Sequence, residues 1–344
     1  MTDAAASAGL PTHPVGIEWP APGGSTPSTV GVIMRTRDRP VLLPRALQSV
    51  VGQTYPHWHL VVVNDGGDPG PVDAAVEATR PHATGVIEVV HLDRSGGMEH
   101  ASNVALTRLD TTYFTVHDDD DTWLPTFLER TVGFLDDAAN RRCGAVVCQS
   151  VRVWERIDGD RIQLLGEEDY TTDERYLDLH RLLGGNWHPP IAFLFRRALP
   201  DIVGPFNEAL PVLGDWDFNL RVASVTEIAV LPEPLARYHL RPAAGPAAYG
   251  NTVVDGLDRH LQHNAAYRAS LLRGALVADP SRLGLVVSLF HEVGELHQRL
   301  ERIEQQNSRL LEELCAVRAE TSRLNRVLTA ISRPLRPFRR FRSS

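Results

Sequence analysis

The chain has 344 residues, a length that suggests about two folded units. With 43% hydrophobic and 23% charged residues, it has enough apolar material for a sizeable core. Its net charge of −8 argues against a general nucleic-acid binder, because that class of protein is basic. All 35 basic residues are arginine, which excludes chemistry that depends on lysine, such as a Schiff base or a P-loop lysine.

The first 28 residues are rich in Ala, Ser, Thr, Pro and Gly, a composition that predicts a disordered tail. This segment lacks the basic start and the apolar stretch of a signal peptide. No apolar run in the chain reaches the roughly 18 residues of a membrane-spanning helix. The three cysteines form no CxxC pair and indicate reduced thiols. We therefore expect a cytoplasmic protein.

Short apolar runs alternate with helical patterns over the next part of the chain. In order, the sequence predicts a strand at 30–34, a helix opening at Pro40, strands at 59–63 and 86–90, a helix from about Glu99, and a strand at 113–116. This alternation indicates an α/β fold with a mainly parallel sheet flanked by helices. Ligands of such sheets bind at the carboxyl ends of the strands, where polar loops here outline a crevice of nucleotide size.

Four consecutive aspartates, residues 118–121, follow the strand at 113–116. Like charges at close range raise one another's pKa, so the run is costly unless a cation neutralises it. Carboxylate oxygens are the ligands that Mg²⁺ and Mn²⁺ prefer. Taken alone, the run fits a metal that bridges a diphosphate and a solvated acidic turn equally well.

The C-terminal part changes character after a helical linker at 246–284. Apolar residues are spaced alternately four and three apart from Leu289 to Ile331, with Asn307 at one a position of the heptads. A single Asn in a Leu-rich seam is typical of a two-stranded parallel coiled coil, so residues 285–332 predict a homodimer. One amphipathic helix packed on its own domain is the other interpretation.

A basic tail closes the chain at residues 333–344. Leu335, Phe338 and Phe341 are interleaved there with five arginines, namely Arg333, Arg336, Arg339, Arg340 and Arg342. Cationic and aromatic residues together suit an anionic membrane surface, and each basic residue contributes about 1 kcal/mol there. Peripheral membrane contact and a solvated tail remain equally good interpretations.

Five motifs between residues 29 and 245 carry a resemblance to family 2 glycosyltransferases, which have the Rossmann-like GT-A fold. They are a Thr-x-x-Arg-Pro loop at 36–40, Gln-Thr-Tyr-Pro and Asn-Asp-Gly at 53–66, Arg-Ser-Gly-Gly at 94–97, the aspartate run, and Gly-Asp-Trp-Asp-Phe-Asn-Leu-Arg at 214–221. Each motif is weak alone, but their common order is a strong signal.

The resemblance implies transfer of a sugar from a nucleotide-diphosphate sugar (UDP-, dTDP- or GDP-linked) to an acceptor hydroxyl, with inversion and with Mn²⁺ or Mg²⁺. It places Asp215 as the general base. The other roles it implies are donor binding by Thr36, Arg39, Asp65, Arg94 and Asp118, metal binding by Asp120 and His239, and acceptor binding by Trp187, His188, Trp216 and Asp217. A surface histidine at 239 and a packed loop at 186–190 are the structural alternatives. The family usually has Glu where this chain has Gly214.

A glycan or lipid-linked glycan acceptor and a role in cell-surface polysaccharide or glycolipid synthesis follow as expectations. The competing enzyme class is a sugar nucleotidyltransferase, but its Gly-rich first loop is missing here, since residues 35–39 read Arg-Thr-Arg-Asp-Arg. A non-catalytic coiled-coil scaffold with a relic nucleotide-binding domain is the other alternative. The presence of Asp118, Asp120 and Asp215 argues against it.

Overall fold

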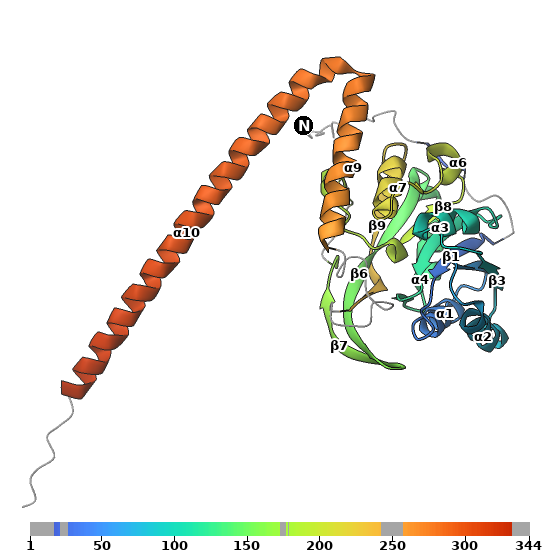
Figure 1. Ribbon diagram of the computed structural model, residues 1–344, viewed down its shortest axis with the longest axis horizontal. Coiled ribbons are helices and arrows are strands. Elements are labelled where there is room, and N and C mark those ends of the chain that lie inside the picture. The colour runs from blue at the N-terminus through green and yellow to red at the C-terminus, as the bar shows by residue number, and fades with distance from the viewer. Residues whose placement is uncertain (1–16, 21–26, 173–176, 178, 242–256, 332–344) are drawn as a thin grey trace, which may run out of the picture. The chain divides into compact units, whose positions relative to one another are not determined.

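The computed structural model describes residues 17–20, 27–172, 177, 179–241 and 257–331. The chain divides into two compact units, residues 1–265 and 266–344. The first contains a mixed sheet with helices beside it, and the second is helical (Figure 1).

A single sheet forms the centre of the first unit, with strand order β3-β2-β1-β4-β8-β6-β9-β5 and β7 paired to β6. The strands are β1 (Val30–Thr36), β2 (Trp58–Asn64), β3 (Val86–His91), β4 (Tyr113–Asp118), β5 (Thr122–Trp123), β6 (Cys143–Asp158), β7 (Arg161–Asp169), β8 (Phe193–Arg196) and β9 (Glu227–Leu240).

The first four strands are parallel, as the alternation of strands and helices predicts. β1 is buried along its whole length and pairs with β2 on one side and β4 on the other. The register sets Thr36 opposite Asn64 and Arg35 opposite Asp118. The polar ends of three strands therefore meet at one edge of the sheet, which we call the carboxyl edge.

Helices cover the sheet because each has one apolar face. The helices of the first unit are α1 (Leu43–Val51), α2 (Pro69–Thr79), α3 (Met98–Leu106), α4 (Phe127–Asp136), α5 (Leu179–Gly184), α6 (Leu199–Val203) and α7 (Gly214–Ala223), with short 3₁₀ turns η1 (Arg80–His82), η2 (Ala138–Asn140) and η3 (Pro190–Ala192). In α1 the residues Leu43, Ala46, Leu47 and Val50 are buried, which is the face expected from the sequence.

Two long strands, β6 and β9, complete the sheet and are absent from the sequence prediction. They pair in parallel from Cys143 opposite Glu227 to Trp154 opposite Leu240. The apolar run at 191–195 enters strand β8 only at Phe193. Pro189 and Pro190 before it lack the backbone N–H groups that a strand needs for pairing, and η3 forms there instead.

The predicted N-terminal tail, residues 1–28, is mostly outside the described residues, but residues 17–20 are packed on the first unit. Trp19 is buried in the core, and its indole N–H donates to Thr226 Oγ1 over 3.1 Å. Its backbone N–H donates to the carbonyl of Arg141. One large aromatic side chain is enough to fix a segment whose composition otherwise predicts disorder.

The second unit contains most of α9 (Leu257–Ala278), the turn η5 (Pro280–Arg282) and the 49-residue helix α10 (Leu283–Ile331). The predicted coiled coil falls on α10, and its pairing with a second chain stays a prediction. The predicted basic tail, residues 333–344, lies outside the described residues. Among the helices that the structure describes, none is long and apolar enough to cross a membrane.

Candidate active site

Arginine side chains surround the aspartate run at the carboxyl edge. Asp118 Oδ1 accepts hydrogen bonds from Arg35 Nε, over 3.1 Å, and from Arg35 Nη2. Arg39 Nη1 lies 2.9 Å from Asp119 Oδ1 and 3.1 Å from Asp120 Oδ2. The cation that the sequence requires beside this run is therefore supplied, in this structure, by guanidinium groups.

Asp120 is the aspartate with the most cationic surroundings. Its Oδ2 accepts hydrogen bonds from both Arg39 and Arg241, and its backbone carbonyl accepts one from Arg45 Nη2 over 2.5 Å. Burial alone would raise the pKa of Asp120, but Arg39 and Arg241 hold it below its ordinary value. Asp120 is thus ionised, as both a metal ligand and an arginine partner must be.

Glu155, a buried residue of β6, organises the far side of the cluster. Its carboxylate accepts from Arg45 Nη1 over 2.5 Å and from Arg241 Nη1 over 2.9 Å, and His239 Nδ1 lies 2.9 Å away. Burial would raise its pKa, but the hydrogen bonds from His239 and Arg45 lower it to about 2. Glu155 therefore fixes three side chains from α1 and from the end of β9.

His239 is buried and already bonded at both ring nitrogens. Nδ1 faces Glu155, and Nε2 lies 2.9 Å from Thr122 Oγ1. Burial lowers the pKa of His239, so the ring is neutral, donates from Nδ1 and accepts at Nε2. The alternative of an exposed surface histidine is wrong, since only 6% of His239 is accessible.

A divalent cation does not fit these residues as they are arranged. Asp120 is paired with arginines, and the lone pair of His239 Nε2 is occupied by Thr122. Within the described ranges, no three His, Cys, Asp or Glu side chains come together as a metal would require. Asp120 and His239 as metal ligands stay a prediction.

The predicted base, Asp215, lies in the first turn of α7. Asn186 Nδ2 donates to its Oδ2 over 2.7 Å, so the loop before η3 holds this carboxylate. Burial raises the pKa of Asp215, and the hydrogen bond from Asn186 opposes that change. The side chain stays partly accessible, as a base that meets an acceptor must be.

The four predicted acceptor residues are placed differently from one another. Trp187 is exposed, whereas Trp216 and His188 are buried. The Trp216 indole N–H donates to the carbonyl of Leu182, and the His188 ring packs edge-on against Phe193. Asp217 is buried and bonded to Arg221 one turn along the helix. As arranged, Trp187 is the one of these four that is open to an acceptor.

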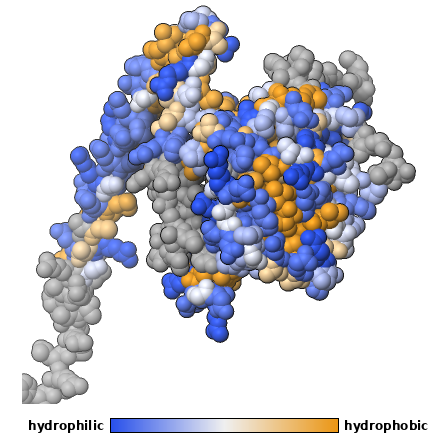
Figure 2. Space-filling model, turned by 45° about the vertical axis from the view of Figure 1, so that its right-hand side comes forward, coloured by the Kyte–Doolittle hydropathy of each residue, from blue (hydrophilic) through white to orange (hydrophobic). Residues whose placement is uncertain are grey.

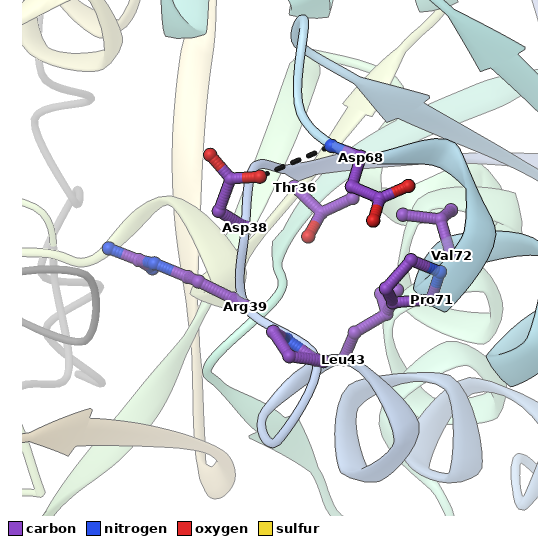
Figure 3. Close-up of a pocket in the computed structure, with 8 residues that line it drawn as sticks. Thr36, Asp38, Arg39, Leu43, Asp68, Pro71 and Val72 are labelled. Carbon is purple, nitrogen blue, oxygen red and sulfur yellow. Dashed lines mark hydrogen bonds between the residues drawn. The ribbon is translucent and has the colours of Figure 1, made fainter.

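A cavity of about 280 Å³ lies between the end of β1 and the starts of α1 and α2. Figure 3 shows Thr36, Leu43, Pro71 and Val72 around it, with Arg39 extending away. The backbone N–H of Asp68 donates to Asp38 Oδ1 over 3.2 Å and closes one side. Apolar walls with carboxylates at the rim suit a flat, polar heterocycle.

Asp65, a predicted donor residue, has a second role in this structure. It accepts hydrogen bonds from Ser95 Oγ and from the backbone N–H groups of Gly96 and Gly97, over 2.6, 2.7 and 3.1 Å. It thereby fixes the loop that carries the exposed Arg94. Gly97 adopts a φ of 93°, which suits glycine.

Residues that the sequence analysis does not single out contribute much of the site. They are Arg35, Arg45, Glu99, Glu155, Asn186 and Arg241. The resemblance assigns none of them a role, and most pair with residues over 65 positions away. The negative charge of four adjacent aspartates could have predicted the arginines, because such a run needs several cations nearby and this chain has arginine as its basic residue.

Comparison with known proteins gives this arrangement a family. Residues 31–199 match the sequence profile described as glycosyl transferase family 2. An uncharacterised glycosyltransferase of Bacillus subtilis, YwdF, is 25% identical over 204 residues, which are 59% of this chain and 71% of that protein. A PGL/p-HBAD biosynthesis glycosyltransferase of Mycobacterium bovis is 27% identical over 233 residues, 65% of this chain and 80% of that one.

Among solved structures, the fragment 1–349 of Staphylococcus aureus TarS in complex with UDP-GlcNAc matches with a TM-score of 0.51 and 21% identity. The match covers 65% of this chain and 61% of that fragment, so the chain spans about three fifths of the fragment's length. At this identity the likeness shows the fold, and it confirms the GT-A architecture expected from the sequence.

The network around Glu155 yields a stability prediction. Glu155→Gln should lower the free energy of unfolding at pH 7 by about 3–5 kcal/mol, because it removes the anion that pairs with Arg45 and one of the two anions that pair with Arg241. Since the pKa of Glu155 is lowered to about 2, its contribution is complete above pH 4.5 and is lost as the pH falls toward 2. Denaturant unfolding from pH 7 to 3 should show the two proteins converging.

Glu233→Gln is the matched control, because Glu233 also pairs with an arginine, Arg130, but at the surface. We expect a change below about 1 kcal/mol there. Equal effects of the two substitutions would contradict the central role of Glu155.

Proposed function

Because this chain belongs to glycosyltransferase family 2, we propose that it transfers a sugar from a nucleotide-diphosphate sugar to an acceptor hydroxyl, with inversion at the anomeric carbon. The fold and the family support this proposal. So does the composition of the carboxyl edge, where a cavity for a heterocycle, a cluster of arginines and a partly accessible carboxylate come from neighbouring strands and loops.

One observation carries the proposal furthest, namely the position of Arg35. It bonds to Asp118 at the end of β4, and its charge is also felt by Asp215 on α7. The aspartate run and the predicted base therefore both lie within electrostatic reach of one guanidinium. A donor held at the run would then have a carboxylate nearby that could act as the base, and an inverting displacement needs such a base on the face opposite the leaving group.

The residues at the edge divide the chemical work. The departing diphosphate gains negative charge, and Arg39, Arg45 and Arg241 are fixed cations beside that position. Asp215 takes the proton of the acceptor hydroxyl as its oxygen attacks the anomeric carbon, a contribution of typically 10²–10⁴-fold. The new glycosidic bond forms as the bond to the diphosphate breaks, without a covalent enzyme intermediate.

The donor pocket and the acceptor class extend the proposal. The cavity beside Thr36 would receive the base, with Arg39 and Arg94 toward the diphosphate. TarS carries UDP-GlcNAc in its complex, and the relatives include teichuronic and colanic acid biosynthesis glycosyltransferases. We infer a UDP-, dTDP- or GDP-sugar as donor, and a glycan or lipid-linked glycan of the cell surface as acceptor.

We also propose that two copies pair through α10. Its apolar a and d residues between Leu289 and Leu324 are more than half exposed, and Figure 2 shows hydrophobic residues uncovered on parts of this unit. In the predicted parallel register Arg299 faces Glu304 of a second copy, and Glu313 faces Arg318. Such a dimer would carry two basic tails to the cytoplasmic face of a membrane, where the acceptor would be anchored.

The predicted cofactor can be tested at Asp120. If Mn²⁺ or Mg²⁺ binds there, UDP or GDP should raise the melting temperature of the wild type more with Mn²⁺ than with EDTA. Asp120→Ala should abolish that difference, whereas Asp160→Ala, at an exposed hairpin, should keep it. Equal shifts with Mn²⁺ and with EDTA in the wild type would contradict the cofactor and leave the arginines to bind the diphosphate.

The second prediction separates chemistry from binding at Asp215. Asp215→Asn should bind a nucleoside diphosphate normally but lose at least about 10²-fold in turnover, as expected for a missing general base. Turnover is measured as release of nucleoside diphosphate in the presence of acceptor. Asp201→Asn, an exposed carboxylate on α6, is the control. Weakened donor binding with unchanged turnover would make Asp215 a donor-site residue.

The third prediction concerns assembly. Light scattering should find a dimer for the full chain, and Leu310→Asp should dissociate it by placing two charges in the seam. Gln305→Asp adds the same charge at the outward f position of the same helix and should leave the dimer intact. A monomeric wild type would refute the coiled coil.

A further inference from the structure

Glu99 is a buried carboxyl group to which the proposed reaction gives no role. It lies in the first turn of α3 and is only 5% exposed. Arg35 Nη1 stands 3.9 Å from its Oε2, beyond hydrogen-bond distance. Among the described residues no group donates a hydrogen bond to Oε2. An unpartnered carboxylate oxygen in the interior is costly, so its place calls for an explanation.

Gly214, the first residue of α7, makes room for this carboxyl group. A Cβ atom at position 214 would lie 2.3 Å from Glu99 Cδ and 2.5 Å from Oε1. Any side chain there would displace Glu99. The glycine therefore allows a carboxyl group from α3 to occupy the space beside α7, directly next to Asp215.

The charges around Glu99 do not balance. Arg35 is a single cation that faces Asp118, Glu99 and Asp215. Asp217, which also acts on Glu99, has its own partner in Arg221. Burial raises the pKa of Glu99 to about 7, although Arg35 opposes the change. Glu99 therefore changes between its protonated and its ionised form near neutral pH.

We propose that Glu99 is a positioning residue on the acceptor side of the site, and that its charge sets the proton affinity of Asp215. This inference rests on the proposed function, in which Asp215 is the base. When Glu99 is protonated, Asp215 has a neutral neighbour. When Glu99 ionises, its negative charge raises the affinity of Asp215 for the proton of the acceptor hydroxyl, so the attack on the anomeric carbon is assisted more strongly.

The pH dependence of turnover tests the proposal. In the wild type, kcat should rise through an ionisation near pH 7. Glu99→Gln mimics the protonated form, so it should match the wild type at pH 6, lack this rise, and be roughly tenfold slower at pH 8.5. The control is Glu208→Gln, which removes a surface carboxylate that contacts α3 through Asn103 and should keep the wild-type profile. A Glu99→Gln profile equal to that of the wild type would overturn the proposal.

An exchange of positions tests the geometry. Gly214→Glu alone should be inactive and less stable, because its side chain overlaps Glu99. In the double variant Glu99→Ala with Gly214→Glu, the carboxylate returns to the same space from α7, so the rise in kcat near pH 7 should reappear. The double variant Glu99→Ala with Gly214→Gln has nearly the same side-chain volume but no charge. Its kcat should therefore not rise near pH 7. Recovery by both double variants would reduce Glu99 to a packing role.

Stability gives a readout that does not need turnover. The pKa of Glu99 is raised in the folded protein, so its contribution to stability is complete below pH 4.5 and is lost as the pH rises through about 7. Glu99→Gln should therefore gain stability relative to the wild type between pH 5 and 8. A constant difference would overturn the proposal even if the wild type transferred no sugar, whereas absence of transfer alone would count against the proposed function only.

Discussion

The carboxyl edge depends on the pairing of buried and half-buried carboxylates with arginines. Asp118, Asp119, Asp120 and Glu155 are all bonded to guanidinium groups, which come from β1, the loop after it, α1 and the end of β9. Without these partners the aspartate run would repel itself and the edge could not stay desolvated. With them, cations and anions are fixed before any ligand arrives, which is the condition for stabilising developing charge without reorganisation.

Two strands that are far apart in the sequence, β6 and β9, bring part of this pairing together. β6 and β9 lie side by side, although 83 to 86 residues separate the paired positions. Glu155 belongs to β6 and His239 to β9, and Arg241 is the first residue after β9. The two strands thereby join the aspartate run to the rest of the domain. A change at Glu155 would consequently be felt at Asp120, which it does not contact but with which it shares Arg241 and Arg45.

The sequence predicts what is encoded locally. β1, β2 and β4 follow from short apolar runs that end in polar loops, and the order of the motifs identifies the family and the GT-A fold. Glu155 and Arg241 could not be predicted, because nothing near them in the chain reveals that they meet. Trp216 and Asp217 share a motif with Asp215, but they follow it on the same helix and point in other directions, so their side chains are buried in the domain. Gly214 stands where the family usually has Glu. The sequence does not reveal that the side chain of Glu99 occupies the space beside this glycine.

The absence of lysine has a consequence for how the enzyme responds to its medium. Every side-chain cation at the carboxyl edge, apart from histidine, is a guanidinium, which keeps its proton at any pH that a protein survives. The positive half of the site therefore does not titrate, and only acids such as Glu99 and Asp215 can change their charge. The guanidinium cations of this edge are therefore not lost in mild alkali, and changes of charge there come from acids such as Glu99 and Asp215.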